Sequence, residues 1–378
     1  MAIEAVIGKR IEQLREAERL TIAELADILG ITRQTMAKYL AGKQAISSDR
    51  LVVLARRFGK SLDWFLEPEE SPSFTLMFRA EQVDGDAKEA FTMVRTDFER
   101  YALANELVGV KTAFVPSSYS VELEGAKGLS DGDKKEIERI AEKQRLLLGI
   151  DGPPGVDLFA ALEDVGINVA AFSLEDDIFG MSAYAPKWGS FIYVNDALRI
   201  PEERKVFSLA HELGHLVLHR DRYVCSSERE VVYQSRRKDI AEKAADHFAG
   251  CLLMPRSRME RDFGFAKEIG LPHLLMHKEK YKVSVQALIM TLHNYGMLSP
   301  STARALFSQL ARRGYRKKEP NPMPYIEKNK RRLAIVQELY LADRITVGKI
   351  AELLGTTIVE ARRLAKEWDC LADETTLL

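Results

Sequence analysis

The pattern His211-Glu212-Leu213-Gly214-His215 constrains this chain of 378 residues more than any other feature. Apolar residues recur around it at helical spacing and predict an amphipathic helix: Leu209, Ala210, Leu213, Leu216 and Val217. Residues four apart lie on one face of a helix, so His211 and His215 can present two imidazole nitrogens to one zinc ion. Glu212 is then placed to deprotonate a water at the metal. The alternative is a helix with two hydrogen-bonded histidines and no metal.

The third ligand is not expected to be His219, although it follows His215 by four residues. From His211 to His219 a helix rises about 12 Å. Three side chains of one straight helix cannot all come within about 2 Å of one ion over that length. We therefore expect His219 behind the ligands or at the surface, and a third ligand from another element.

Residues 240–255 provide the best source of that ligand, because they predict a helix with two carboxylates on one face. Glu242 and Asp246 lie four residues apart, with alanines alongside that allow close packing against the histidine helix. We expect Glu242 to be the third ligand and Asp246 to accept the second ring N–H of His211. The alternative is a solvated helix face that carries two acids.

The first 67 residues predict a run of five short helices. Thr21 and Glu24 form a capping box at the start of a helix over residues 22–29, which Gly30 ends. Thr32 then caps a helix over residues 33–40. A helix, a short turn with glycine and a second helix is the helix-turn-helix pattern.

The second helix of such a motif enters the major groove of DNA and presents polar side chains to the bases. The residues expected to be exposed for this role are Arg33, Gln34, Thr35, Lys38 and Tyr39, with Met36, Ala37 and Leu40 facing inward. Lys43 follows in the next loop and is expected to reach a phosphate. Residues 1–66 hold eleven Lys and Arg against eight Asp and Glu, a net of +3. Because this excess is modest, a protein-interaction module of the same fold is the alternative.

This segment resembles the Cro/repressor-like (XRE) family of helix-turn-helix domains. The residues that carry the resemblance are Leu25-Ala26, Gly30, residues 31–35, residues 39–42 and residues 62–66. The resemblance implies a five-helix domain whose partner is DNA.

Residues 155–300 predict an α+β domain. A helix over residues 156–166 precedes strands at 167–172, 181–184 and 191–195, which lead to the histidine helix. An edge strand beside the metal would hold an extended substrate chain by adding it to the sheet. The residues whose type suits stabilisation of an oxyanion are Tyr184, Tyr193 and His293.

These stretches resemble the ImmA/IrrE family of zinc metallopeptidases. The resemblance rests on Asn195, residues 201–204, residues 207–219, residues 242–249 and residues 252–255. It implies a gluzincin-like site, with His211, His215 and Glu242 on zinc (manganese is the alternative) and Glu212 as general base. Together with the XRE-like domain it implies cleavage of a repressor-type protein in stress, prophage or mobile-element control. The second hypothesis is a regulator or antitoxin whose metal site is structural or sensory.

The rest of the chain gives weaker signals. Residues 68–150 predict a linker and a helical scaffold, and residues 301–378 a basic linker and a helical C-terminal domain. Residues 312–332 hold nine Lys and Arg, which predict either a solvated charge run or a nucleic-acid contact. Residues 346–357 parallel residues 21–32 and predict a second helix-turn-helix-like pair. For that pair we favour a packing or dimer role over DNA contact.

Composition sets the outer bounds. The net charge of −1 gives no global indication of nucleic-acid binding. We find no signal-peptide h-region and no apolar run of 18 residues. Three scattered cysteines, Cys225, Cys251 and Cys370, suit a reducing cytoplasm. Cys225 is either a redox-responsive ligand or, more simply, a loop cysteine. We expect a cytoplasmic, mostly α homodimer with an α+β catalytic domain over residues 151–300.

Overall fold

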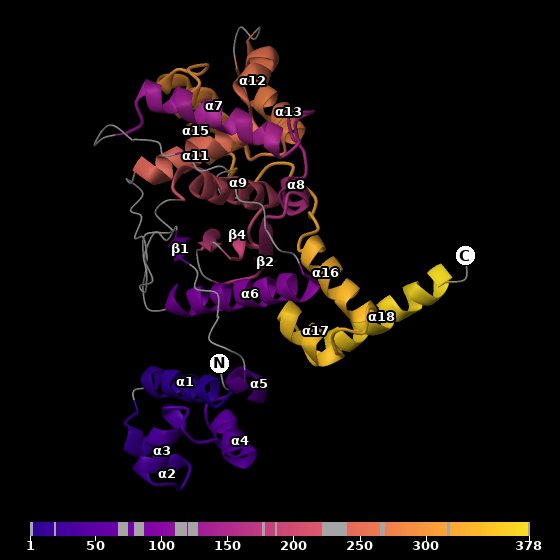
Figure 1. Cartoon of the computed structure of the whole chain (residues 1–378). Coiled ribbons are helices and arrows are strands. Elements are labelled where there is room, and N and C mark those ends of the chain that lie inside the picture. Colours follow the sequence, from indigo (N-terminus) through magenta and orange to yellow (C-terminus); the bar gives the residue numbers. More distant parts are fainter. Residues whose placement is uncertain are drawn as a thin grey trace. The chain divides into compact units, whose positions relative to one another are not determined.

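The computed structural model divides the chain into two compact units, Met1–Ser73 and Phe74–Leu378 (Figure 1). It describes residues 3–18, 20–66, 75–78, 87–109, 119, 128–175, 178–185, 187–220, 240–264, 269–315 and 318–376. The chain is mostly helical with one small sheet, as predicted. No helix in the described ranges combines the length and apolar character needed to cross a membrane.

The first unit contains five helices: α1 (Ile3–Ala17), α2 (Ile22–Ile28), α3 (Arg33–Leu40), α4 (Ser48–Arg57) and α5 (Leu62–Leu66). The predicted capping box is present, since the Thr21 backbone N–H donates to Glu24 Oε2 at 2.8 Å. Gly30 takes the left-handed conformation (φ 61°) that ends α2. Apolar side chains of all five helices form one core, so the predicted helix-turn-helix fold is confirmed.

The second unit is built on a four-stranded sheet: β1 (Thr75–Phe78), β2 (Asn168–Phe172), β3 (Gly180–Ala185) and β4 (Gly189–Asn195). The strand order is β1-β3-β4-β2. Strand β3 runs antiparallel to both of its neighbours, and β2 runs parallel to β4. Strand β1 therefore comes from a segment that lies far before the other three strands in the sequence.

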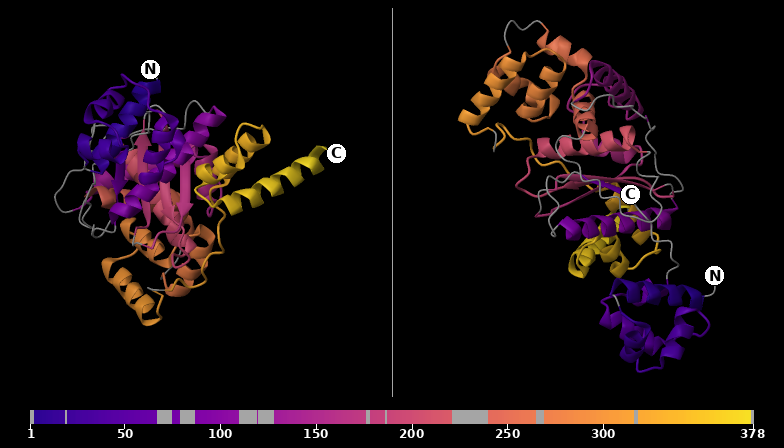
Figure 2. Two further views of the ribbon diagram at one scale, coloured as in Figure 1. Left: turned by 90° about the horizontal axis from the view of Figure 1, so that it is seen from below. Right: turned by 90° about the vertical axis from the view of Figure 1, so that its left-hand side faces the viewer.

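Helices cover both faces of this sheet. Helix α9 (Glu202–Leu218) lies on one face and α6 (Ala87–Val108) on the other (Figure 1; Figure 2, right). Successive side chains of a strand point to opposite faces. Accordingly, Ile192 of β4 packs in the core with α9, while Phe191 packs in the core with α6. The sheet is thus buried on both faces, and this packing fixes the position of α9 relative to the sheet.

A further helical layer covers α9. It comprises α7 (Asp131–Leu147), α8 (Leu158–Asp164), α11 (Ile240–Leu253), α12 (Arg256–Phe263), α13 (Leu271–Tyr281), α14 (Val285–Asn294) and α15 (Pro300–Arg312). Helix α11 packs against both α9 and α7, and all three share one apolar core. Helix α7, expected to be part of a scaffold, therefore helps to position the helix that carries Glu242.

The C-terminal helices α16 (Lys330–Leu341) and α17 (Val347–Leu354) pack on α6, and α18 (Ile358–Thr376) packs on α16 and α17. Gly355, between α17 and α18, is left-handed (φ 64°), and a Cβ there would lie 2.8 Å from Arg100 Nη1 of α6. Buried Arg332 donates to Asp97 Oδ2 at 2.8 Å. The helix pair predicted over this segment is present, and these contacts show that it packs within the second unit.

Part of the basic segment 312–332 is neither solvated nor free for nucleic acid. Lys328 and Arg332 are buried, so both predictions are wrong for these two residues. Lys328 Nζ lies 2.8 Å from Glu202 Oε2 and 2.9 Å from Asp196 Oδ1, at the start of α9. The composition of a basic segment does not show whether acidic residues elsewhere in the fold will pair with its lysines and arginines.

Candidate metal centre

Three buried side chains converge between α9 and α11. The Nε2 atoms of His211 and His215 lie 3.0 Å apart. They lie 3.3 and 3.2 Å from the two carboxylate oxygens of Glu242, respectively. Donor atoms that share one tetrahedral zinc are roughly 3.3 Å apart, given metal–ligand distances of about 2.0–2.1 Å. The three residues therefore have the spacing and the chemical character of a zinc ligand set.

The orientation of the two imidazole rings supports the same fit. His211 Nδ1 donates to Asp246 Oδ1 at 2.9 Å, as expected from the sequence. His215 Nδ1 lies 3.2 Å from His219 Nδ1. Because each ring uses Nδ1 for a partner on the protein, Nε2 is left to present its lone pair toward Glu242. Two lone pairs and a carboxylate directed at one point suit a divalent cation.

His219 lies behind the ligands and is buried, so it supports His215 and has no surface role. This placement agrees with the helical rise that keeps His219 from reaching the same ion as His211. Its ring lies 5.4 Å from the ring of His215, measured between centroids. His219 thus limits the rotation of His215 from the C-cap position of α9.

Small residues bring α11 close enough for Glu242 to reach the histidines. A Cβ on Gly214 would lie 3.2 Å from the Cα of Ala245 and 3.0 Å from Phe248 Cδ1. These separations are tighter than ordinary van der Waals contacts, so a larger residue would push the two helices apart. The glycine inside the H-E-x-x-H pattern is thus part of the positioning of the third ligand.

Glu212 points from α9 toward the sheet. The Ser182 hydroxyl donates to Glu212 Oε2 at 2.6 Å, and both residues are buried. A Cβ on Gly180, two residues earlier on β3, would lie 2.9 Å from Glu212 Cγ. Sequence reasoning missed Ser182, since a short strand does not indicate which of its faces meets the metal helix. Strand β3 therefore fixes the position of the Glu212 carboxylate.

Burial raises the pKa of the Glu242 carboxyl, but the neighbouring His211 and His215 lower it by more, so this pKa lies well below the ordinary value. The carboxylate is therefore anionic throughout the physiological range. An anionic ligand beside two imidazoles partly neutralises a divalent cation in a buried site.

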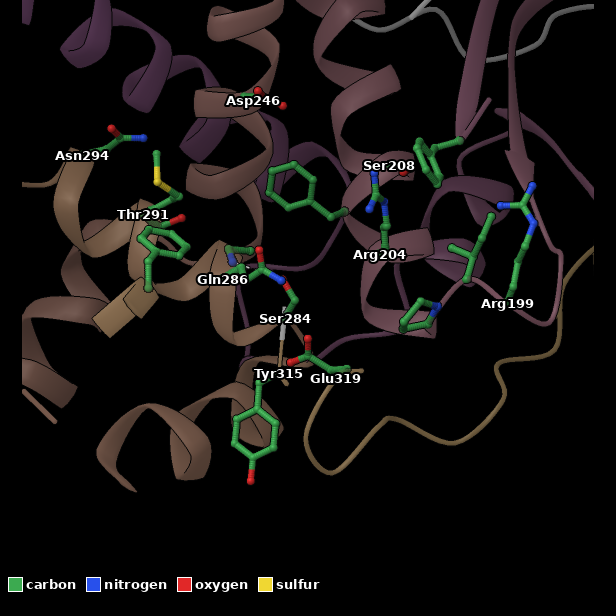
Figure 3. Close-up of a pocket in the computed structure, with 17 residues that line it drawn as sticks. Arg199, Arg204, Ser208, Asp246, Ser284, Gln286, Thr291, Asn294, Tyr315 and Glu319 are labelled. Carbon is green, nitrogen blue, oxygen red and sulfur yellow. Dashed lines mark hydrogen bonds between the residues drawn. The ribbon is translucent and has the colours of Figure 1, made fainter. Parts of the chain in front are cut away.

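A cleft of about 550 Å³ opens beside this centre (Figure 3). Asp246 of α11 lies at its rim, and Arg204 and Ser208 of α9 line one side. Residues of α14, including Thr291 and Asn294, line the other side. The cleft is lined by both polar and apolar side chains and lies next to the candidate ligands. Sites that bind small molecules or peptides commonly have this character.

Among the described residues, a second group could also hold a metal: Glu138, His247 and Cys251. His247 Nε2 lies 3.7 Å from Cys251 Sγ and 3.6 Å from Glu138 Oε1. However, Arg256 donates to both oxygens of Glu138, at 2.7 and 2.8 Å. Burial also raises the pKa of Cys251 to about 12. A guanidinium on the carboxylate and a protonated thiol favour a polar cluster that ties α7 to α11.

Two of the three residues considered for oxyanion stabilisation hydrogen-bond to backbone carbonyls. The Tyr193 hydroxyl donates to the carbonyl of Phe172 at 3.0 Å, and His293 Nδ1 lies 3.1 Å from the carbonyl of Leu298. Tyr184 packs under the guanidinium of Arg220. Cys225 lies outside the described residues. Tyr193 and His293 are therefore held by the backbone and do not face the candidate ligands through these atoms.

On the helix-turn-helix, the structure places four of the six predicted contact residues at the exposed surface: Arg33, Gln34, Lys38 and Lys43. Thr35 is half-buried and hydrogen-bonds to Thr32. Tyr39 was predicted to be exposed, which is wrong: it is buried, and Arg50 Nη1 donates to its hydroxyl at 2.8 Å. Tyr39 follows Met36 by three residues and shares its inward face, whereas Ala37 points to solvent.

Comparison with known proteins agrees with both halves of this description. A family profile described as IrrE N-terminal-like domain matches residues 162–293, and a helix-turn-helix profile matches residues 11–65. A putative HTH-type transcriptional regulatory protein of Pyrococcus abyssi is 27% identical over 141 residues, which are 37% of this chain and 42% of the relative.

Two further relatives match shorter stretches. An uncharacterized HTH-type transcriptional regulator of Rickettsia conorii is 37% identical over 65 residues, 17% of this chain and 52% of the relative. Antitoxin PezA of Streptococcus pneumoniae is 32% identical over 77 residues, 19% of this chain and 49% of the relative. The chain thus spans about half the length of the curated relatives it matches.

Among solved structures, the apo competence regulator ComR of Streptococcus vestibularis aligns over 91% of this chain and 100% of its own. Its identity is 12% and its TM-score 0.16, values that carry no structural argument. The two profiles confirm the resemblances drawn from the motifs. The chain therefore carries an N-terminal XRE-type helix-turn-helix domain and an IrrE/ImmA-like domain.

Proposed function

We propose that this protein is a DNA-binding transcriptional regulator that is also a zinc-dependent endopeptidase. The observation that carries the proposal is the convergence of His211, His215 and Glu242, with Glu212 next to His211 in the sequence of the same helix. Its protein substrate would be a repressor-type regulator, cleaved in stress, prophage or mobile-element control. That substrate class follows from the family resemblance and the fused helix-turn-helix domain.

His211, His215 and Glu242 would hold the metal, with zinc preferred over manganese because two imidazoles contribute to the donor set. When bound, zinc would supply Lewis acidity, which polarises a carbonyl group and makes a water molecule more acidic. Asp246 and His219 keep the two rings oriented through their Nδ1 atoms. The protein's part is therefore to hold a charged, rigid ligand set that needs little rearrangement.

Glu212 would act as the general base. Ser182 donates to Oε2 and holds the carboxylate, which would take the proton of the attacking water. The water oxygen then bonds to the carbonyl carbon of the substrate. As the C–N bond breaks, Glu212 passes the proton to the leaving nitrogen. The products are one carboxylate and one amine, so the step needs no further reactant.

The test is the variant Glu212→Gln, which removes the base and keeps the shape of the side chain. Zinc-loaded protein would be incubated with peptides from a whole-proteome digest and with a repressor encoded beside it, and new termini identified by mass spectrometry. We expect wild type and the surface control Glu260→Gln to cleave, and Glu212→Gln to bind zinc without cleaving. Cleavage by Glu212→Gln at the wild-type rate would refute the mechanism.

A second function is favoured by the relatives, which are named as regulators and as an antitoxin. In that case the metal would be structural or sensory. Zinc removal would then change DNA binding, whereas Glu212→Gln would change nothing. The same pair of measurements separates the two functions, because the peptidase requires Glu212 and a structural site does not.

A further inference from the structure

The edge of β3 is covered by a segment of this same chain. Within the stretch that matches the IrrE-like profile, residues 162–293, the sheet consists of β2, β4 and β3, and β3 is one of its two edges. Strand β1 lies outside that stretch and pairs antiparallel with this edge, from Thr75 opposite Tyr184 to Phe78 opposite Met181. An edge that the matched domain leaves open is therefore occupied in cis.

This edge is the one beside the general base. Ser182 of β3 donates to Glu212, and Gly180 packs against its side chain. The register sets Met77 opposite Ser182, and Phe78 opposite the residue that follows Gly180. Extended peptides commonly bind by adding a strand to an exposed sheet edge. Strand β1 thus pairs with the strand that contacts the base, as a bound peptide would.

Strand β1 lies at the boundary between the two units in the sequence. It follows the helix-turn-helix unit, Met1–Ser73, and begins the unit that holds the candidate metal centre. A break in the backbone within β1 would separate the two units, and no other bond joins them in sequence. Cleavage there would release the proposed DNA-binding unit from the proposed peptidase.

We propose that β1 is an intramolecular substrate, and that the protein cleaves its own backbone within residues 75–78. This inference rests on the proposed peptidase function. A water oxygen bonds to the carbonyl carbon of the scissile peptide, and the C–N bond breaks. Glu212 moves the proton from the water to the nitrogen. One fragment ends in a new carboxylate and carries the helix-turn-helix unit, and the other begins with a new amine.

The experiment starts from full-length protein freed of metal by chelation, to which zinc is added. We expect intact-mass spectrometry to show two fragments that join within residues 75–78. The first-order rate constant should be the same over a tenfold range of protein concentration, because a cis reaction is unimolecular. Glu212→Gln should bind zinc and stay intact.

The double variant Leu76→Pro/Met77→Pro tests the strand itself. Neighbouring N–H groups of a strand point to opposite sides, so one of the two prolines removes a ladder hydrogen bond to β3. Self-cleavage should slow roughly tenfold or more. Cleavage of digest peptides in trans should stay equal or rise, because the edge is uncovered. A variant that loses both activities while wild type retains them would mark β1 as structural and overturn the proposal.

The outcomes separate this inference from the function on which it rests. Wild type that cleaves digest peptides but leaves its own chain intact overturns self-cleavage alone. Wild type that cleaves neither overturns both. Self-cleavage that maps outside residues 75–78, or whose rate constant rises with protein concentration, overturns the cis geometry and leaves the peptidase in place.

Discussion

Asp246 offers the sharpest test of the metal centre, because it touches a proposed ligand without being one. Its Oδ1 accepts the Nδ1–H of His211 at 2.9 Å, while its side chain is 44% exposed at the rim of the cleft. Replacement should leave the fold intact, since substitutions at exposed positions usually change stability by about 0.5 kcal/mol or less. Any loss of zinc affinity then reports on the orientation and basicity of His211.

The size of the effect follows from what each variant removes. Partners of metal-bound histidines typically contribute 10–100-fold to metal affinity, or about 1.4–2.7 kcal/mol. Asp246→Asn keeps an oxygen that can accept from His211 but removes the charge, so we expect a loss near tenfold. Asp246→Ala removes both the charge and the acceptor and should approach a hundredfold loss.

The assay is competition between the metal-free protein and a chelating indicator for zinc. Asp262→Asn is the matched control, since that carboxylate accepts from Lys280 Nζ and the Tyr281 hydroxyl at 2.6 and 2.7 Å, away from the metal centre. It should bind zinc as wild type does. If Asp246→Ala also binds zinc with wild-type affinity, the proposed ligand role of His211 is refuted.

Three further predictions concern the base, the pH dependence and the DNA contacts. Gly180→Ala places a Cβ 2.9 Å from Cγ of the general base, so peptide cleavage should fall at least tenfold while zinc content, measured by mass spectrometry, stays unchanged. Burial raises the pKa of Glu163 from 4.5 to about 7, against a hydrogen bond from the Arg331 backbone. The folded protein thus binds this proton more tightly than the unfolded chain, and the stability it contributes is complete below about pH 4.5 and lost as the pH rises through about 7. Glu163→Gln should therefore raise the melting temperature more at pH 8 than at pH 5, with at most about 3 kcal/mol gained, and an equal change at both pH values would contradict the assignment. Arg33→Ala/Lys38→Ala should weaken DNA binding by at least tenfold and flatten its salt dependence in a gel-shift titration, and unchanged affinity would favour the protein-interaction module.

Much of the arrangement could be predicted from periodicity and caps. The H-E-x-x-H spacing predicted one face for both histidines, and the alanines beside Glu242 indicated a closely packed second helix. Prediction failed where the face of an element depends on its neighbours. Tyr39 follows Met36 by three residues and is core, although its chemistry suits a base contact. The role of Ser182 depends on which face of β3 meets α9.

Ion pairs between residues far apart in the sequence could not be predicted either. Two such pairs hold helix α9, which carries two of the candidate ligands. Lys278 lies 2.7 Å from Glu203 Oε1, and Lys328 pairs with Glu202, so buried cations from two distant segments fix the first turn of α9. Breaking such a pair leaves an uncompensated buried charge, which destabilises the fold. The first turn of α9 is therefore held firmly in place. His211 follows two turns later on the same rigid helix, above a strand that positions the base. The geometry of the centre is therefore set jointly by the sheet, by α11 and by the charged segment that returns from the C-terminal side.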